Sequence, residues 1–283
     1  MNSFTMPATS WAFPATNDQV EVMARALLIR GLLVGLLAGI LMFGFGKLAG
    51  EPSVDRAIAF EAAHEHAEHQ AGHSHDHGDA TAEAPEPELF SRGTQSGIGL
   101  LTGVGVYGIA FGGLFSLVFA YAYGRIGTAG PKSLAALLAA TGFLAITVVP
   151  MIIYPSNPPA VGEPDTIAHR TALYFIMIAI SVGAAVGAIV LHTKLARRTE
   201  GWTAGLAALA AYVLVIGVTA ALLPGIDEVP ADFPASVLWH FRIASMGLQL
   251  VMWSTFGIAF GYAAEHLLAP QRRGLGRLQP LVR

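Results

Sequence analysis

The sequence predicts an all-α, polytopic membrane protein with about six transmembrane helices. Of its 283 residues, 54% are hydrophobic and only 12% are charged, whereas a soluble domain carries about 25% charged residues. Residues 98–123 and 133–154 contain no charge at all, and each run is long enough for a helix to cross a bilayer core. In hydrocarbon only helices and closed barrels satisfy their own backbone, and barrel strands are shorter and alternate in polarity.

The predicted helices follow one another along the chain with short connections after the second. The six spans cover about 27–48, 97–123, 133–154, 171–192, 204–223 and 236–264. Glycines four positions apart let helices approach closely in lipid, so the spans that carry them are expected to lie inside a compact bundle. These glycines are Gly31, Gly35 and Gly39 in the first span, Gly99, Gly103, Gly108 and Gly112 in the second, and Gly183 and Gly187 in the fourth.

The placement of lysine and arginine predicts the orientation, because cytoplasmic loops carry an excess of both. With the N-terminus inside, eleven of the sixteen basic residues fall on the cytoplasmic side and five on the other. Both termini are therefore predicted to be cytoplasmic. The chain then divides into a disordered N-terminal extension (1–24), a helical domain (25–265) with an exoplasmic loop at 50–96, and a basic cytoplasmic tail (266–283).

A rival topology makes the first span a cleaved signal peptide. A charged residue, Lys47, stands just before the small residues that would be cut, and the apolar run is longer than that of an ordinary signal peptide. Both features favour a retained membrane helix.

The strongest chemical signal is the tract 64–79, HEHAEHQAGHSHDHGD, inside the predicted exoplasmic loop. Neutral imidazole suits cobalt, nickel, copper and zinc, whereas magnesium and calcium prefer oxygen ligands. The tract contains two glycines and no apolar face, so it is predicted to be a mobile collector of divalent metal and not a single tight site. Its candidate ligands are His64, His66, His69, His73, His75, His77, Asp76 and Asp79.

Polar residues near the outer ends of the fourth and sixth spans are candidates for an ion path. The connections before these spans are rich in proline and carboxylates, and each leads into a helix with His and Arg near its start. The candidate residues are Glu163, Asp165, His169, Asp232, His240 and Gln249. Two other interpretations stay open: the histidines can be interfacial anchors, and Gln249 can form a hydrogen bond between helices.

The motifs of common enzyme classes are missing from the sequence. His64-Glu65 is followed by Glu68 where the zinc-protease motif HExxH needs its second histidine, and neither Lys47 nor Lys132 stands in a Walker A motif. The absence of cysteine excludes disulfides and thiolate metal sites. The chain is therefore predicted not to be an enzyme and to hold no tightly bound cofactor.

Three motifs carry a resemblance to a known family: GEP-x-VDRAI at 50–58, NPPAVG-x-P at 157–164 and VP-x-x-FPA at 229–235. With them, the chain from about 25 to 265 resembles the CbtA family, the large subunit of a proposed cobalt transporter. The resemblance implies a bacterial inner-membrane protein in cobalamin-related cobalt supply. It also implies a small single-span, histidine-containing partner, CbtB.

Two functions are consistent with these observations. In the first, the chain is a subunit for uptake of Co²⁺, with Ni²⁺ or Zn²⁺ as alternative ions, and the His-rich loop passes metal into the helical bundle. In the second, it is a non-transporting membrane subunit that binds metal and delivers it to a partner complex. A polar cavity lined by acids would favour the first, and a glycine-tight bundle with an apolar interior the second. The expected partners are lipid, the CbtB-like subunit and further copies of the chain, with no nucleic acid.

Overall fold

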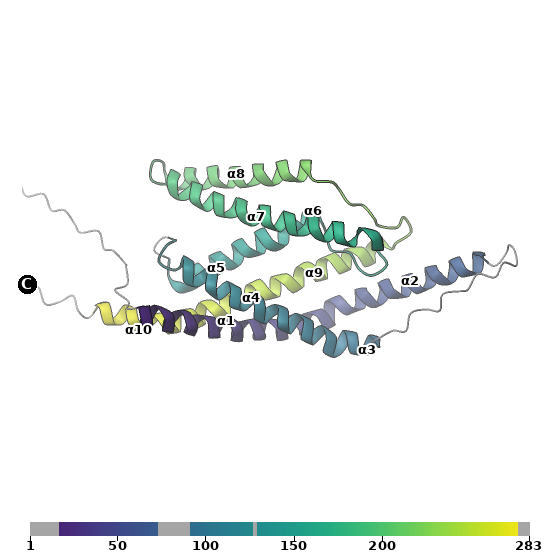
Figure 1. The fold of residues 1–283 in the computed structure, drawn as a ribbon, viewed down its shortest axis with the longest axis horizontal. Coiled ribbons are helices and arrows are strands. Elements are labelled where there is room, and N and C mark those ends of the chain that lie inside the picture. Colours follow the sequence, from purple (N-terminus) through teal and green to yellow (C-terminus); the bar gives the residue numbers. More distant parts are fainter. Residues whose placement is uncertain (1–16, 73–90, 127–128, 277–283) are drawn as a thin grey trace, which may run out of the picture.

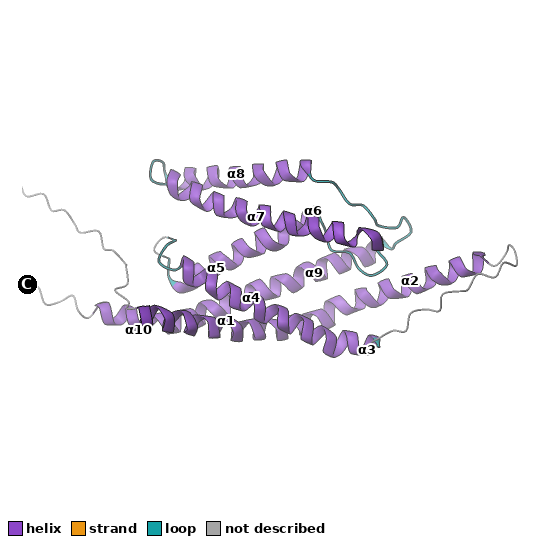
Figure 2. Cartoon of the chain, viewed as in Figure 1, coloured by secondary structure: helices purple, strands orange, loops and turns teal. Residues whose placement is uncertain are grey.

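The structure, a computed structural model, describes residues 17–72, 91–126 and 129–276. Within these ranges every regular element is helical (Figure 2). Six helical stretches are long and apolar enough to span a membrane, which confirms the predicted fold class. They are Glu21–His64, Arg92–Ala122, Pro131–Ile153, Pro164–Leu195, Gly201–Leu222 and Ala235–Leu268.

The first stretch is one continuous rod made of α1 (Asn17–Phe45), a π-helical turn (Gly46–Gly50) and α2 (Glu51–Gly72) (Figure 1). Helix therefore begins inside the extension predicted to be disordered at 1–24. It also continues through the first part of the predicted loop at 50–96. The reason is cooperative: extending an existing helix costs far less than starting one, and α2 is rich in Ala and Glu, which are strong helix formers.

The second span packs on the first through facing glycines. It consists of α3 (Arg92–Thr94), a π-helical turn (Gln95–Gly99) and α4 (Leu100–Ala122). Gly31 faces Gly112 and Gly35 faces Gly108, and a Cβ on any of these four would lie under 3.0 Å from backbone of the other helix. The predicted close approach is confirmed here. By contrast, no described atom of another helix lies within 4 Å of a Cβ built at Gly103, Gly183 or Gly187.

The third span changes its winding before a proline. Helix α5 (Pro131–Gly142) leads through a π-helical turn (Phe143–Val148) into α6 (Val149–Ile153). Pro150 lacks an N–H group and would clash with the carbonyl four residues earlier in a regular helix. The wider turn directly before it relieves this conflict, and Pro150 is fully buried.

The remaining elements form a peripheral hairpin and a central helix. A 3₁₀ turn (Pro164–Thr166) leads into α7 (Ile167–Leu195), and α8 (Gly201–Leu222) packs back on α7 at one side of the bundle (Figure 1). The last span consists of α9 (Ala235–Thr255), a π-helical turn (Phe256–Phe260) and α10 (Gly261–Gly276). It contributes Trp253, Phe256 and Phe260 to the main core, where they contact Phe115 and Phe119 of α4.

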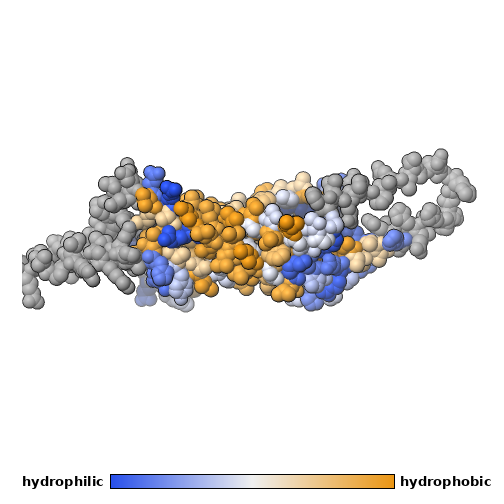
Figure 3. Space-filling view, turned by 90° about the horizontal axis from the view of Figure 1, so that it is seen from below, coloured by the Kyte–Doolittle hydropathy of each residue, from blue (hydrophilic) through white to orange (hydrophobic). Residues whose placement is uncertain are grey.

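The surface divides into a hydrophobic band and two polar ends (Figure 3). The start of α1 and the end of α10 lie at one end of the bundle, and α2, α3 and the connections 154–166 and 223–234 lie at the other (Figure 1). We call the second end the loop end. An even number of spans requires this arrangement, since each crossing reverses the side of the chain.

The three sequence motifs meet at the loop end. Ala57 of the first motif, Val161 of the second and Phe233 of the third form one buried cluster with Val237 of α9. Phe60, one turn beyond Ala57, packs edge-on against Phe233 with ring centroids 5.0 Å apart. Helix α2 is thereby docked on the two connections that lead into α7 and α9. The three motifs thus pack against one another, and this packing fixes the positions of the polar residues on the two connections.

Candidate functional site

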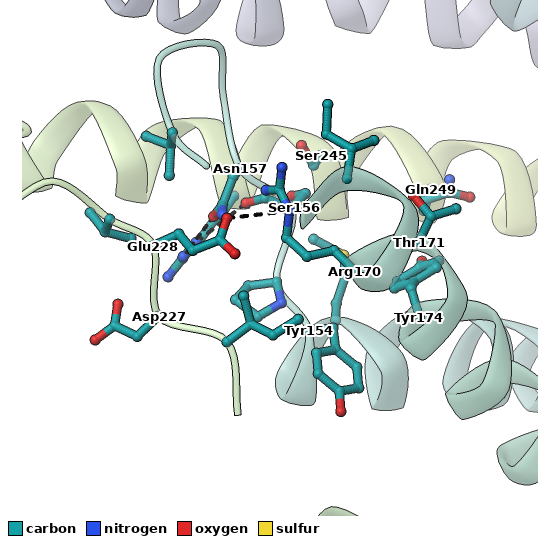
Figure 4. Close-up of a pocket in the computed structure, with 17 residues that line it drawn as sticks. Tyr154, Ser156, Asn157, Arg170, Thr171, Tyr174, Asp227, Glu228, Ser245 and Gln249 are labelled. Carbon is teal, nitrogen blue, oxygen red and sulfur yellow. Dashed lines mark hydrogen bonds and ion pairs between the residues drawn. The ribbon is translucent and has the colours of Figure 1, made fainter. Parts of the chain in front are cut away.

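A half-open pocket of about 500 Å³ lies between the end of α6, the start of α7, the connection before α9, and α9 itself (Figure 4). Along α9 it reaches from Arg242 to Gln249, and seven residues of helix correspond to roughly 10 Å. The pocket therefore extends from the loop end into the membrane-spanning part of the bundle. Its polar lining residues are Ser156, Asn157, Arg170, Thr171, Asp227, Glu228, Arg242, Ser245 and Gln249.

One wall of the pocket is fixed by Glu228. Its Oε2 accepts a hydrogen bond from the Glu163 backbone N–H at 2.9 Å and lies 3.4 Å from Arg170 Nε. Arg170 Nη2 also donates to the Glu163 carbonyl at 3.3 Å. Gly162 makes this arrangement possible, because its φ is +114° and a Cβ there would collide with the Arg170 guanidinium. The connection before α7 and the connection before α9 are thus tied together by charge.

The same contacts lower the pKa of Glu228 below its ordinary value of 4.5. The Glu163 N–H contributes most, followed by a hydrogen bond from Thr166 and by the charge of Arg170, while partial burial acts in the opposite direction. Each of the three favourable contacts stabilises the carboxylate over the neutral acid. Glu228 is therefore an ionised, structurally engaged carboxylate at neutral pH.

A pH prediction follows from Glu228. Its folded pKa is depressed, so its stabilising contribution is complete above pH 4.5 and is lost as the pH falls through the lower folded value. Glu228→Gln should therefore lower the thermal unfolding midpoint of the detergent-solubilised protein at neutral pH. The difference from wild type should shrink steadily below about pH 4.5. An equal difference at pH 7 and at about pH 3.5 would show that the charge of Glu228 has no such role.

Arg242 stands on the other wall and is held only by neutral oxygens. Its Nε donates to the Ser156 carbonyl at 3.3 Å, and its Nη2 donates to Asn157 Oδ1 at 2.9 Å. In the part of the chain that the structure describes, no Asp or Glu oxygen lies within 4.0 Å of an Arg242 nitrogen. Arg170 is neutralised by Glu228, whereas the charge of Arg242 is left without a nearby counter-charge.

Gln249 marks the deep end of the pocket. Its Nε2 donates to the Tyr107 hydroxyl of α4 at 3.3 Å, so the hydrogen bond between helices that the sequence left open is present. Gln249 Oε1 is buried and has no hydrogen-bond partner among the described residues, and the same holds for Ser156 Oγ. Two residues that line the pocket thus each carry a buried polar atom without a hydrogen-bond partner.

The described part of the histidine tract is helical. His64 and His66 lie on α2 with exposed side chains, and residues up to Gly72 continue the helix. Residues 64–72 thus form a helix inside the segment predicted to be a loop, and the mobility of the tract stays a prediction. Residues two positions apart on a helix do not face each other, so His64 and His66 do not form the expected chelate. The side chain of His69 and the whole of His73, His75, His77, Asp76 and Asp79 lie outside the described residues.

His64 brings the tract into contact with a predicted path residue. Its Nδ1 lies 3.3 Å from Asp232 Oδ2, and its ring stacks on Phe60 at 5.5 Å between centroids. This places the start of the tract on the connection that leads into α9. Over residues 17–72, 91–126 and 129–276, however, no group of three or more His, Asp or Glu side chains is arranged to hold a metal ion.

The other predicted path residues are not brought together. Asp165, His169 and His240 are exposed, and His240 Nδ1 contacts the Ser236 carbonyl one turn earlier at 2.6 Å. Glu163 takes part through its backbone, and of the six candidates only Gln249 lines the pocket.

Arg170 and Arg242, near the starts of α7 and α9, were visible in the sequence but were not predicted to line a pocket. A usable signal was present, because both follow a proline-rich connection within two turns of a helix start. Burial of such a charge in a membrane protein is expensive unless it has a role. The contributions of Ser156 and Asn157 had no comparable signal.

Comparison with known proteins gives one family. The profile described as CbtA, probable cobalt transporter subunit, matches residues 24–265, a range that includes the pocket and all three motifs. No curated protein matches the chain, and no solved structure matches it. The family resemblance read from the motifs is confirmed.

Proposed function

Because the chain belongs to the CbtA family of probable cobalt transporter subunits, we propose that it carries divalent cobalt across a bacterial inner membrane into the cell. Six helices suited to span a membrane support a multi-pass protein. In this proposal the histidine tract collects metal outside, the pocket at the loop end receives it, and both termini lie in the cytoplasm. The distribution of basic residues supports that orientation.

The observation that carries the proposal is the polar pocket that descends from the loop end to Gln249. A membrane protein with a merely structural interior has no need of charged residues and unsatisfied oxygens at this depth, since each costs free energy. The contact between His64 and Asp232 supports a direct handover, because it places the first histidine of the tract on the connection that also supplies Glu228.

The alternative is a non-transporting membrane subunit that binds Co, Ni or Zn and delivers it to a partner complex. Two observations favour it. The interface between α1 and α4 is closed by glycine packing and offers no path, and the pocket exposes the charge of Arg242, which repels a bare cation. A histidine-containing single-span subunit of the CbtB type, or further copies of this chain, would then complete the path.

Uptake of radioactive cobalt separates the two proposals. Cells that lack their own cobalt transporters should accumulate the isotope when they express this chain together with a candidate single-span, histidine-containing partner. If the chain conducts the ion, a variant such as Gln249→Leu should lower the maximal rate at equal expression, because it removes the polar floor of the pocket. A chain that only delivers metal would give the same rate with either form.

A further inference from the structure

The charges of the pocket are unevenly placed, and the part around Arg242 does not suit a bare cation. Arg170 and Glu228 neutralise each other at 3.4 Å, and Asp227 stands apart from this pair in Figure 4. Arg242 contacts only the Ser156 carbonyl and the Asn157 side-chain oxygen. One positive charge therefore faces the pocket without a close counter-charge.

Arg242 also has N–H groups that are not used in its contacts with Ser156 and Asn157. A guanidinium has five N–H donors, and two of them are used by the contacts to Ser156 and Asn157. The remaining donors are not among the buried atoms that lack a partner, and Arg242 lines the pocket. Ser156, whose carbonyl accepts from Arg242, has a buried hydroxyl with no hydrogen-bond partner within the described chain.

We propose that this wall binds a carboxylate group of a small water-soluble molecule, with Arg242 as the main contact. The planar fork of a guanidinium matches a carboxylate through two parallel hydrogen bonds. A volume of about 500 Å³ lies within the usual range for small-molecule sites. The site goes beyond the proposed metal transport, because carboxylate binding needs no metal and can be measured without it.

An oxyanion at this place has two possible sources, a small acid from solution or the phosphate of a lipid headgroup. Two connections, 155–161 and 226–229, supply much of the lining, and they lie at the loop end of the bundle (Figure 1). This favours access from water.

The test uses the purified full-length protein in lipid-free detergent, with succinate as probe and its neutral diamide, succinamide, as control. Isothermal titration should show binding of succinate and none of succinamide. Arg242→Gln should weaken succinate binding at least about tenfold, in line with the loss of a charged hydrogen bond. Arg242→Lys, which keeps the charge and loses the fork, should fall between the two. Arg56→Gln is the matched control, because Arg56 is exposed on α2 and bonds only within its helix.

Two results would overturn the assignment. Equal heats from succinate and succinamide in the wild-type protein would remove the carboxylate site, and this comparison needs no variant to fold. Native mass spectrometry is the second arm. A phospholipid retained by the wild type and lost from Arg242→Gln would identify the oxyanion as a lipid phosphate. Neither result depends on cobalt uptake, so the proposed function can fail or hold separately.

Discussion

Replacing all six histidines of the tract 64–79 with asparagine should raise the cobalt concentration for half-maximal uptake by at least about tenfold. Local concentration of a charged substrate at a complementary site changes encounter rates by about 10- to 1,000-fold. In the proposed function, the imidazoles of the tract supply the metal affinity. The maximal rate should stay within about twofold of wild type, since neither His64 nor His66, the two with described side chains, lines the pocket. Initial rates of radioactive cobalt uptake over a concentration series give both quantities.

A matched variant controls for the loss of histidine as such. His192, in the last turn of α7, lies at the opposite end of its helix from the pocket, and His192→Asn should leave both quantities unchanged. If the tract variant instead loses maximal rate while its half-maximal concentration is constant, the tract belongs to the crossing step. The collector role would then have to be abandoned.

Gly35→Leu should give the largest loss of folded protein. A Cβ at Gly35 would lie under 3.0 Å from the backbone of Gly108 on the facing helix, and backbone cannot move aside as a flexible side chain can. Overpacking of this kind costs about 1–3 kcal/mol and sometimes more. A leucine adds three further carbons at the same place. We expect most of the variant to aggregate on detergent extraction, and the remainder to unfold several degrees lower than wild type.

Gly103→Leu on α4 is the control variant, because it introduces the same residue at a position outside the contact between α1 and α4. It makes the same chemical change on the partner helix, where no described atom lies within 4 Å of the new Cβ. Its monodisperse fraction in fluorescence-detected size-exclusion chromatography should equal that of wild type. Similar losses in both variants would mean that close helix contact is not what holds α1 against α4.

The spans were predictable because their signal is local, whereas the pocket depends on contacts between distant segments. Apolar length and glycine spacing identify α1 and α4 from the chain alone. The extension of α1 into α2 was missed because α2 has only a short buried face, formed by Ser53 and Ala57, inside a sequence that otherwise looks like a polar loop. That face is visible only once the connections carrying Val161 and Phe233 are folded against it.

The candidate site was predicted only in part for the same reason. Gln249 was identifiable as a polar residue deep in an apolar span. The pairing of Arg170 with Glu228 joins residues 58 positions apart (228 − 170), and nothing in the local sequence around either residue specifies the other. Asp165, His169 and His240 looked equivalent to these residues in the sequence, but their side chains are exposed and do not line the pocket.

The uninterrupted helix from α1 through α2 also sets the distance between the first histidine of the tract and the membrane surface. His64 lies 16 residues beyond position 48 (64 − 48), the predicted end of the first span, or roughly 24 Å along the helix. The headgroup layer is only about 5–8 Å thick on each side, and surface charge is screened within about 8 Å at physiological ionic strength. On a helix that leaves the bilayer upright, the His64 imidazole thus stands beyond the ion cloud that gathers at anionic lipids. Its metal occupancy should follow the bulk solution and remain the same whatever the charge of the surrounding leaflet.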